Sequence, residues 1–104
     1  MSEYNIFMTH VASKDLKDIT SYIANELKEP IAAKIIVGKI KEAVMSLREM
    51  PNRHSVIDEE IIAAKAIRKI MINNYIVFFI VSENSNIVTI IRILYGRRDW
   101  INLL

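Results

Sequence analysis

The chain has 104 residues and a formal net charge of +2, and this length predicts a single domain over residues 1–104. Hydrophobic residues make up 52% of the sequence and cysteine is absent, which allows a real core but excludes disulfides and thiolate zinc sites. The longest apolar run, residues 75–81, is far shorter than the ~20 residues of a membrane helix, and the N-terminus lacks the features of a signal peptide, so we expect a cytoplasmic protein without membrane contacts.

The first half of the sequence predicts a strand and a helix. Residues 4–9 alternate in the manner of a short strand. Ser13 is the expected N-cap of the helix that follows, with Asp15 in its first turn. One face of this helix is indicated by apolar residues at helical spacing, namely Ala12, Leu16, Ile19, Ile23 and Leu27.

A second helix begins directly after the first. Pro30 suits the first turn of a helix, and Pro51 marks the point before which this one ends. The short connection predicts an antiparallel helix hairpin. Gly38 stands in the middle of the second helix, where it costs about 1 kcal/mol relative to alanine, and close approach of the first helix is the expected reason. The buried face is predicted by Ala33, Ile36, Ile40, Val44 and Leu47.

The second half of the sequence predicts strands. Residues 52–65 are expected to form a loop with a short helical turn. Residues 66–72, 75–82 and 87–95 are rich in Ile, Val, Phe and Tyr, and asparagines in the two connections suit tight turns, so we expect a three-stranded antiparallel meander. The order β-α-α-β-β-β predicts an α+β fold with the helix hairpin packed on a small antiparallel sheet.

The basic residues are concentrated late in the chain. Residues 61–104 contain six Lys or Arg and two Asp or Glu, a surplus that favours an anionic partner, although a solvated surface is the alternative. Alternation along residues 87–95 places Ile90, Arg92 and Leu94 on one side of the strand. Arg92 either forms an internal ion pair, with Glu83 or Asp99, or joins Arg68 on an open sheet face.

Aromatic and titratable residues leave further alternatives open. Tyr75, Tyr95 and Trp100 lie near the arginines in the sequence, which suits stacking on single-stranded RNA, while packing in the core is the other interpretation. His10 and His54 have no second ligand at a metal spacing and are interpreted as surface or structural residues. We expect no metal and no cofactor.

Several segments together carry a resemblance to a known family. They are residues 15–23, 30–33, 47–51, the NYIVFF segment 74–79 and the IRILYGRRDW segment 91–100. On these segments the chain resembles the RelE/ParE superfamily of toxins from type II toxin–antitoxin and plasmid stabilisation systems, and it is closer to the ParE branch. The resemblance implies a small antiparallel sheet on a helix hairpin, growth arrest, and neutralisation by a cognate antitoxin in a hetero-oligomer.

The resemblance implies two alternative targets. The RelE branch cleaves messenger RNA on the ribosome with basic residues and a proton-transfer group, whereas the ParE branch inhibits DNA gyrase without catalytic residues. Where the cleaving branch has an arginine four residues before Tyr75, this chain has Met71, which favours gyrase inhibition and a protein that is not an enzyme. An inactive toxin-derived binding domain is a further alternative.

The resemblance also implies the residues of the site. If the chain is a ribonuclease, the expected catalytic residues are Arg68, Arg98 and Tyr95, where Tyr95 replaces a histidine found in many relatives. On either interpretation, a surface that binds target or antitoxin is expected to contain Arg68, Arg92, Tyr95, Arg97, Arg98 and Trp100.

Overall fold

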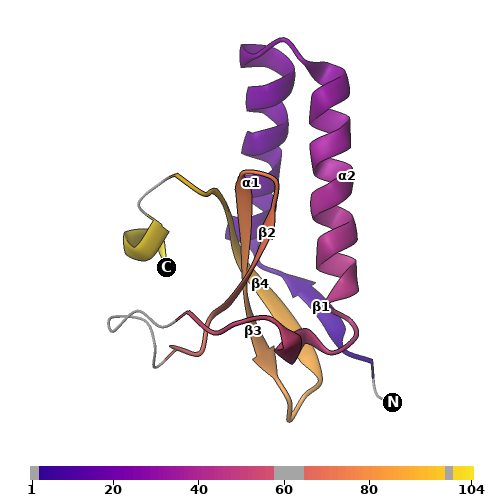
Figure 1. Ribbon diagram of the computed structural model, residues 1–104, viewed down its shortest axis with the longest axis vertical. Helices are drawn as coiled ribbons and strands as arrows, with labels where there is room; N and C mark the ends of the chain where they lie inside the picture. Colours follow the sequence, from indigo (N-terminus) through magenta and orange to yellow (C-terminus); the bar gives the residue numbers. More distant parts are fainter. Residues whose placement is uncertain (1–2, 58–64, 98–99) are drawn as a thin grey trace.

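A computed structural model describes residues 3–57, 65–97 and 100–104, in which a helix hairpin lies along a four-stranded sheet (Figure 1). This arrangement confirms the predicted α+β class and element order. The acidic run at residues 58–60 lies outside the described residues. The elements are β1 Asn5–Met8, α1 His10–Ser21, a π-helical turn Tyr22–Glu26, α2 Pro30–Ser46, a 3₁₀ turn Pro51–Arg53, β2 Arg68–Ile72, β3 Tyr75–Ser82, β4 Ile87–Tyr95 and the 3₁₀ helix η4 Trp100–Leu103.

The sheet is mixed, with strand order β1-β4-β3-β2. Strands β2, β3 and β4 form the predicted antiparallel meander, and its turns contain Asn73 and Asn86 in the left-handed conformation at φ 53°. Strand β1 pairs parallel with β4, from Asn5 opposite Ile87 to Met8 opposite Ile90. The prediction of an antiparallel sheet was therefore wrong for this one strand, because pairing across the helix hairpin leaves no local turn that sets its direction.

Helix α1 begins earlier than predicted. Its N-cap is Thr9, whose Oγ1 accepts a hydrogen bond from the Ala12 N–H at 3.0 Å. The same hydroxyl donates to the Ile91 carbonyl at 3.2 Å, so the cap also ties the helix to β4. Ser13 was the wrong cap because the chain turns into the helix directly after β1.

The end of the first helix also differs from the prediction. A π-helical turn closes with the Leu27 N–H donating to the Tyr22 carbonyl at 3.1 Å. This wider turn changes the phase of the apolar face, so Leu27 is 52% exposed instead of buried. Lys28 in the left-handed conformation, at φ 55°, then reverses the chain before Pro30 starts α2.

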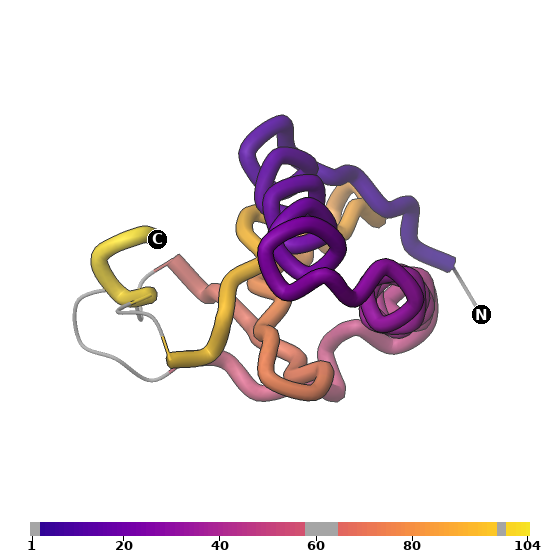
Figure 2. Tube along the Cα trace, turned by 90° about the horizontal axis from the view of Figure 1, so that it is seen from above, coloured from indigo at the N-terminus to yellow at the C-terminus, as the bar shows by residue number. Residues whose placement is uncertain are grey.

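Two hydrophobic clusters cover the two faces of the sheet. The helices and the sheet enclose the first, which is built from Ala12, Ile40, Val44, Leu47, Ile72, Val77, Phe79, Val88, Ile90 and Ile93. The second lies on the other face and contains Ile57, Ile67, Ile76, Phe78 and Leu94, with η4 packed against it. Figure 2 shows α2 and the C-terminal segment on opposite sides of the strands. Burial on both faces confirms the interpretation of the continuous apolar run in β3.

Gly38 has open space beside it, so the predicted close approach of α1 was wrong. A Cβ atom built at Gly38 meets nothing within 4 Å. Replacing Gly38 by alanine is therefore expected to stabilise the chain by about 0.5–1 kcal/mol, because alanine loses less backbone entropy on folding. The measurement is thermal unfolding followed by circular dichroism.

Gly96→Ala is the control for this experiment. A Cβ atom there would lie 3.2 Å from the Asn74 carbonyl oxygen, a contact that forces a shift in the backbone. The two glycine substitutions should consequently move the melting temperature in opposite directions. A lower melting temperature for Gly38→Ala would contradict the expectation.

Candidate functional site

A β-bulge in β4 determines where its side chains point. Phe78 pairs with Arg92 but the next residue, Phe79, pairs with Ile90, so Ile91 is an extra residue in β4. The bulge breaks the alternation predicted from the sequence, since Ile90 packs in the first cluster while Leu94 packs in the second. Placing Ile90, Arg92 and Leu94 on one side of the strand was wrong for this reason.

Arg92 forms a largely buried ion pair with Asp15 of α1. Its Nε and Nη2 atoms donate to the two carboxylate oxygens of Asp15, each at 2.8 Å, and the side chains are only 20% and 10% exposed. The hydrogen bonds that the Arg92 guanidinium donates to Asp15 raise the pKa of Arg92. The ion-pair alternative from the sequence is thus observed, with Asp15 as the partner. Of the two expected partners, Glu83 accepts a hydrogen bond from Asn52, and Asp99 lies outside the described residues.

Asp15 also completes the edge of the sheet. Strand β1 ends opposite Ile90, so beyond that residue no strand among the described residues pairs with this edge of β4. The Ile93 N–H donates to the Asp15 carboxylate at 3.0 Å and is satisfied there. Sequence reasoning missed this role. Asp15 stands three residues after Ala12 and four before Ile19, on the apolar face, and an acid at that position is a usable signal for a buried partner.

Arg68 and Arg92 do not share a face of the sheet. Arg68 lies opposite Phe79 and Arg92 opposite Phe78, and neighbouring residues of a strand point to opposite faces. The Arg68 Nη1 donates to the backbone carbonyls of Asn52 and His54, at 3.2 and 2.5 Å. The predicted open face that gathers the two arginines was therefore wrong, because each has its own internal partner and both sheet faces are covered.

Trp100 packs in the second cluster. Its ring lies 5.2 Å from the Phe78 ring, measured between centroids, and the Lys69 ammonium lies 5.4 Å from its centroid. The core-packing alternative is thus observed for this side chain, while its role in binding stays a prediction. Arg97 is exposed, and Arg98 lies outside the described residues.

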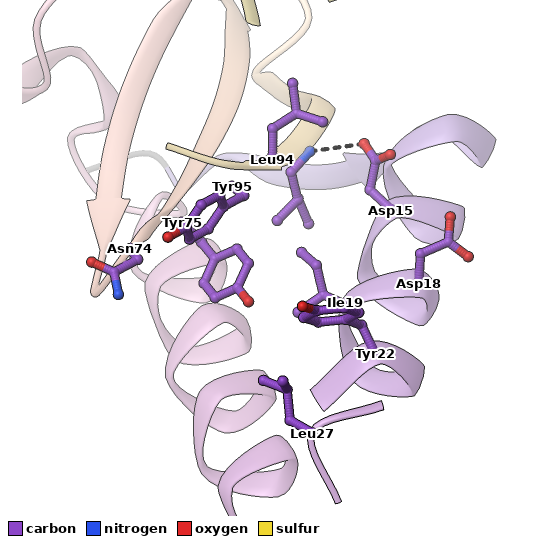
Figure 3. Close-up of a pocket in the computed structure, with 10 residues that line it drawn as sticks. Asp15, Asp18, Ile19, Tyr22, Leu27, Asn74, Tyr75, Leu94 and Tyr95 are labelled. Carbon is purple, nitrogen blue, oxygen red and sulfur yellow. Dashed lines mark hydrogen bonds between the residues drawn. The ribbon is translucent and has the colours of Figure 1, made fainter. Parts of the chain in front are cut away.

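Tyr95 and Tyr75 form one wall of a pocket of about 670 Å³ at the end of the sheet nearest the β2–β3 turn. Their rings meet edge to face with centroids 5.7 Å apart. Figure 3 shows Ile19 and Tyr22 across the pocket, Leu27 at one end, and Asp15 and Asp18 on α1. Burial raises the pKa of the Tyr75 hydroxyl, and Tyr95 and Tyr22 add to that rise. Next to this wall, the Gly96 N–H donates to the carbonyl of Asn74, which also lines the pocket, at 2.7 Å.

The ring of His54 is half-buried. It packs edge-on against Phe79 at 5.9 Å, and its Nε2 atom is buried with no hydrogen-bond partner among the described residues. Burial lowers the pKa of His54, and the charges of Arg53 and Arg68 lower it further.

The imidazole of His54 should accordingly be protonated more readily in the unfolded chain than in the folded chain. Stability is then greatest above the ordinary His54 pKa of 6.5 and declines as the pH falls from 6.5 toward the lowered value. Urea unfolding of the native chain and of His54→Phe, across pH 5 to 7.5, checks this. The variant keeps an aromatic ring but has no titratable nitrogen, so its free energy of unfolding should depend less on pH. An equal pH dependence in the two proteins would contradict the role of His54.

Neither a metal cluster nor a membrane helix is found in the part of the chain that the structure describes. Within residues 3–57, 65–97 and 100–104, His, Asp and Glu side chains form no group of three or more that could hold a metal ion. In the same ranges, each helix is too short or too polar to cross a membrane.

The fold, two helices packed on a four-stranded mixed sheet, is similar to that of chains in solved structures of toxin–antitoxin systems. Similar structures come from the chromosomal ParDE system of P. aeruginosa (TM-score 0.72, 22% identity, 89% of this chain and 96% of that chain) and the RelBE2 complex of Mycobacterium tuberculosis (TM-score 0.64, 17% identity, 89% and 98%). No curated protein sequence matches the chain. The family described as the ParE toxin of the type II toxin–antitoxin system parDE matches residues 6–100, so the chain belongs to that toxin family.

Proposed function

We propose that this toxin arrests growth by inhibiting DNA gyrase and that a cognate antitoxin neutralises it. The family match supports the ParE-like mechanism over the RelE-like one. The observation that carries the proposal is that Arg68 and Arg92 both bind internal partners. Ribonuclease chemistry needs cations that are free to point at a scissile phosphate, and these two arginines are not.

The strand arginines are both held by internal partners. Arg92 is neutralised by Asp15, and Arg68 is held by the carbonyls of Asn52 and His54. Met71, at the position where the cleaving branch has an arginine, is 61% exposed and brings no charge. These contacts favour a surface that binds a protein over one that stabilises a phosphorane-like transition state.

An antitoxin as partner is supported by the apolar surface of the hairpin. Large apolar side chains around the connection between the two helices stay exposed, namely Tyr22 at 54%, Leu27 at 52%, Ile31 at 74% and Ile35 at 54%. Exposed apolar groups in such numbers on a small domain mark a surface that a partner covers. The similar structures are toxin–antitoxin systems, which agrees with this proposal.

A supercoiling assay with purified gyrase tests the proposal. The native chain at micromolar concentration is expected to inhibit supercoiling or to trap the cleavage complex. Arg97→Ala is expected to weaken inhibition, since Arg97 is exposed and belongs to the predicted binding surface, whereas Lys41→Ala, at an exposed position of α2 outside that surface, serves as the control. Supercoiling that proceeds unchanged would reject gyrase as the target.

The ribonuclease alternative retains one observation in its favour, the exposed Arg97 beside Tyr95, which is 37% exposed. Primer extension on messenger RNA with ribosomes tests it on the same preparation. Cuts in the ribosomal A site that Tyr95→Phe abolishes would establish the RelE-like mechanism. Intact message together with unaffected gyrase and growth would indicate an inactive toxin-derived binding domain.

A further inference from the structure

The pocket beside the β2–β3 turn has a composition suited to one kind of ligand. Three tyrosines, at positions 22, 75 and 95, contribute aromatic rings from two directions (Figure 3). Between them lie aliphatic side chains, among them Ile19 and Leu27. A ligand that fits must therefore combine an apolar stem with a group that aromatic faces attract.

The charges at the pocket are negative. Asp15 and Asp18 are among its lining residues, and in the part of the chain that the structure describes the lining includes no lysine or arginine. Asp15 is already satisfied by Arg92, but Asp18 is 66% exposed and its ion pair is with Lys14, which is 69% exposed. Exposed pairs one helical turn apart contribute only about 0.5 kcal/mol, so Asp18 can exchange Lys14 for another cation at little cost.

We propose that this pocket receives an arginine side chain presented by a protein partner. The aliphatic part of arginine would lie against Ile19 and Leu27, and its flat guanidinium would stack on the tyrosine rings with Asp18 at the rim. Cation–π attraction strengthens where water is excluded, and Tyr75 offers a partly buried ring for such a contact. The inference depends on the pocket alone and holds whichever target the toxin has.

The test uses small probes of matched shape on the isolated chain. N-butylguanidinium, neutral N-butylurea and N-butylammonium are titrated while the tyrosine ring resonances are followed by NMR. We expect N-butylguanidinium to shift the rings of Tyr22, Tyr75 and Tyr95 and to bind about fivefold or more tightly than N-butylurea. Equal affinity of these two, or no binding of either, would overturn the proposal, and tighter binding of N-butylammonium would overturn the choice of arginine.

A pair of variants separates recognition by the tyrosine rings from nonspecific binding to exposed apolar side chains. Tyr22→Leu keeps apolar volume at a residue that is 54% exposed, so the fold should survive, and affinity for N-butylguanidinium should fall about fivefold. Phe7→Leu is the matched control, because Phe7 is an aromatic residue that is 58% exposed on β1 and outside the pocket. A folded Tyr22→Leu protein with unchanged affinity would refute stacking on the rings.

Discussion

Replacing Asp15 by alanine is expected to lower the free energy of unfolding by about 3–5 kcal/mol, because it leaves the Arg92 guanidinium largely buried without its counter-charge. The Ile93 N–H at the edge of β4 loses its acceptor in the same step. Urea unfolding at neutral pH, followed by circular dichroism, measures the change. A loss of this size is a large part of the stability of so small a domain.

Asp18→Ala is the matched control, since Asp18 lies one turn along α1 in an exposed pair with Lys14. Its removal should cost no more than about 0.5 kcal/mol. The double variant Asp15→Leu with Arg92→Met should recover part of the loss, because two apolar residues can replace a buried pair. Similar losses for Asp15→Ala and Asp18→Ala would show that the buried pair contributes little.

Replacing Trp100 by alanine is expected to destabilise the chain by about 2–3 kcal/mol, less than a fully buried tryptophan would cost. The reason is that its ring packs against Phe78, which is fully buried, and also contacts the Lys69 ammonium group. Urea unfolding by circular dichroism again gives the value. If Trp100 served only to bind target or antitoxin, the stability of the isolated chain would not change.

Phe7→Ala provides the comparison for Trp100→Ala. Phe7 is also aromatic but 58% exposed, so its loss should cost less than about 1 kcal/mol. Because Trp100 is the only tryptophan of the chain, the fluorescence of the native protein reports directly on the second cluster. A fluorescence transition that precedes the loss of helix signal would show that η4 detaches first.

The order of the elements was predictable because the hydrophobic period changes from helical spacing to runs of β-branched and aromatic residues. Local turn chemistry was also readable, as Asn73 and Asn86 show by their left-handed conformations. What the sequence did not reveal depends on distant contacts. The capping hydroxyl of Thr9 also bonds Ile91, 82 residues away, and no local pattern favours it over Ser13.

The candidate site was less predictable than the fold. Because Ile91 is an extra residue in β4, the side chains after it point to the opposite sheet face from the one that simple alternation predicts. Arg92 was correctly marked as a residue needing an anion, but its partner lies 77 positions earlier in the sequence. Tyr95 was predicted as a binding residue, whereas Tyr22, on the opposite wall of the pocket, was not, since only the fold brings these two together.

The parallel pairing of β1 with β4 has a consequence for synthesis on the ribosome. β1 emerges long before its neighbour in the sheet, Ile87–Tyr95. Contacts between segments so far apart in sequence raise the contact order and slow folding. A nascent chain therefore holds β1 without its native neighbour until β4 has been synthesised, and the native sheet cannot close before that point.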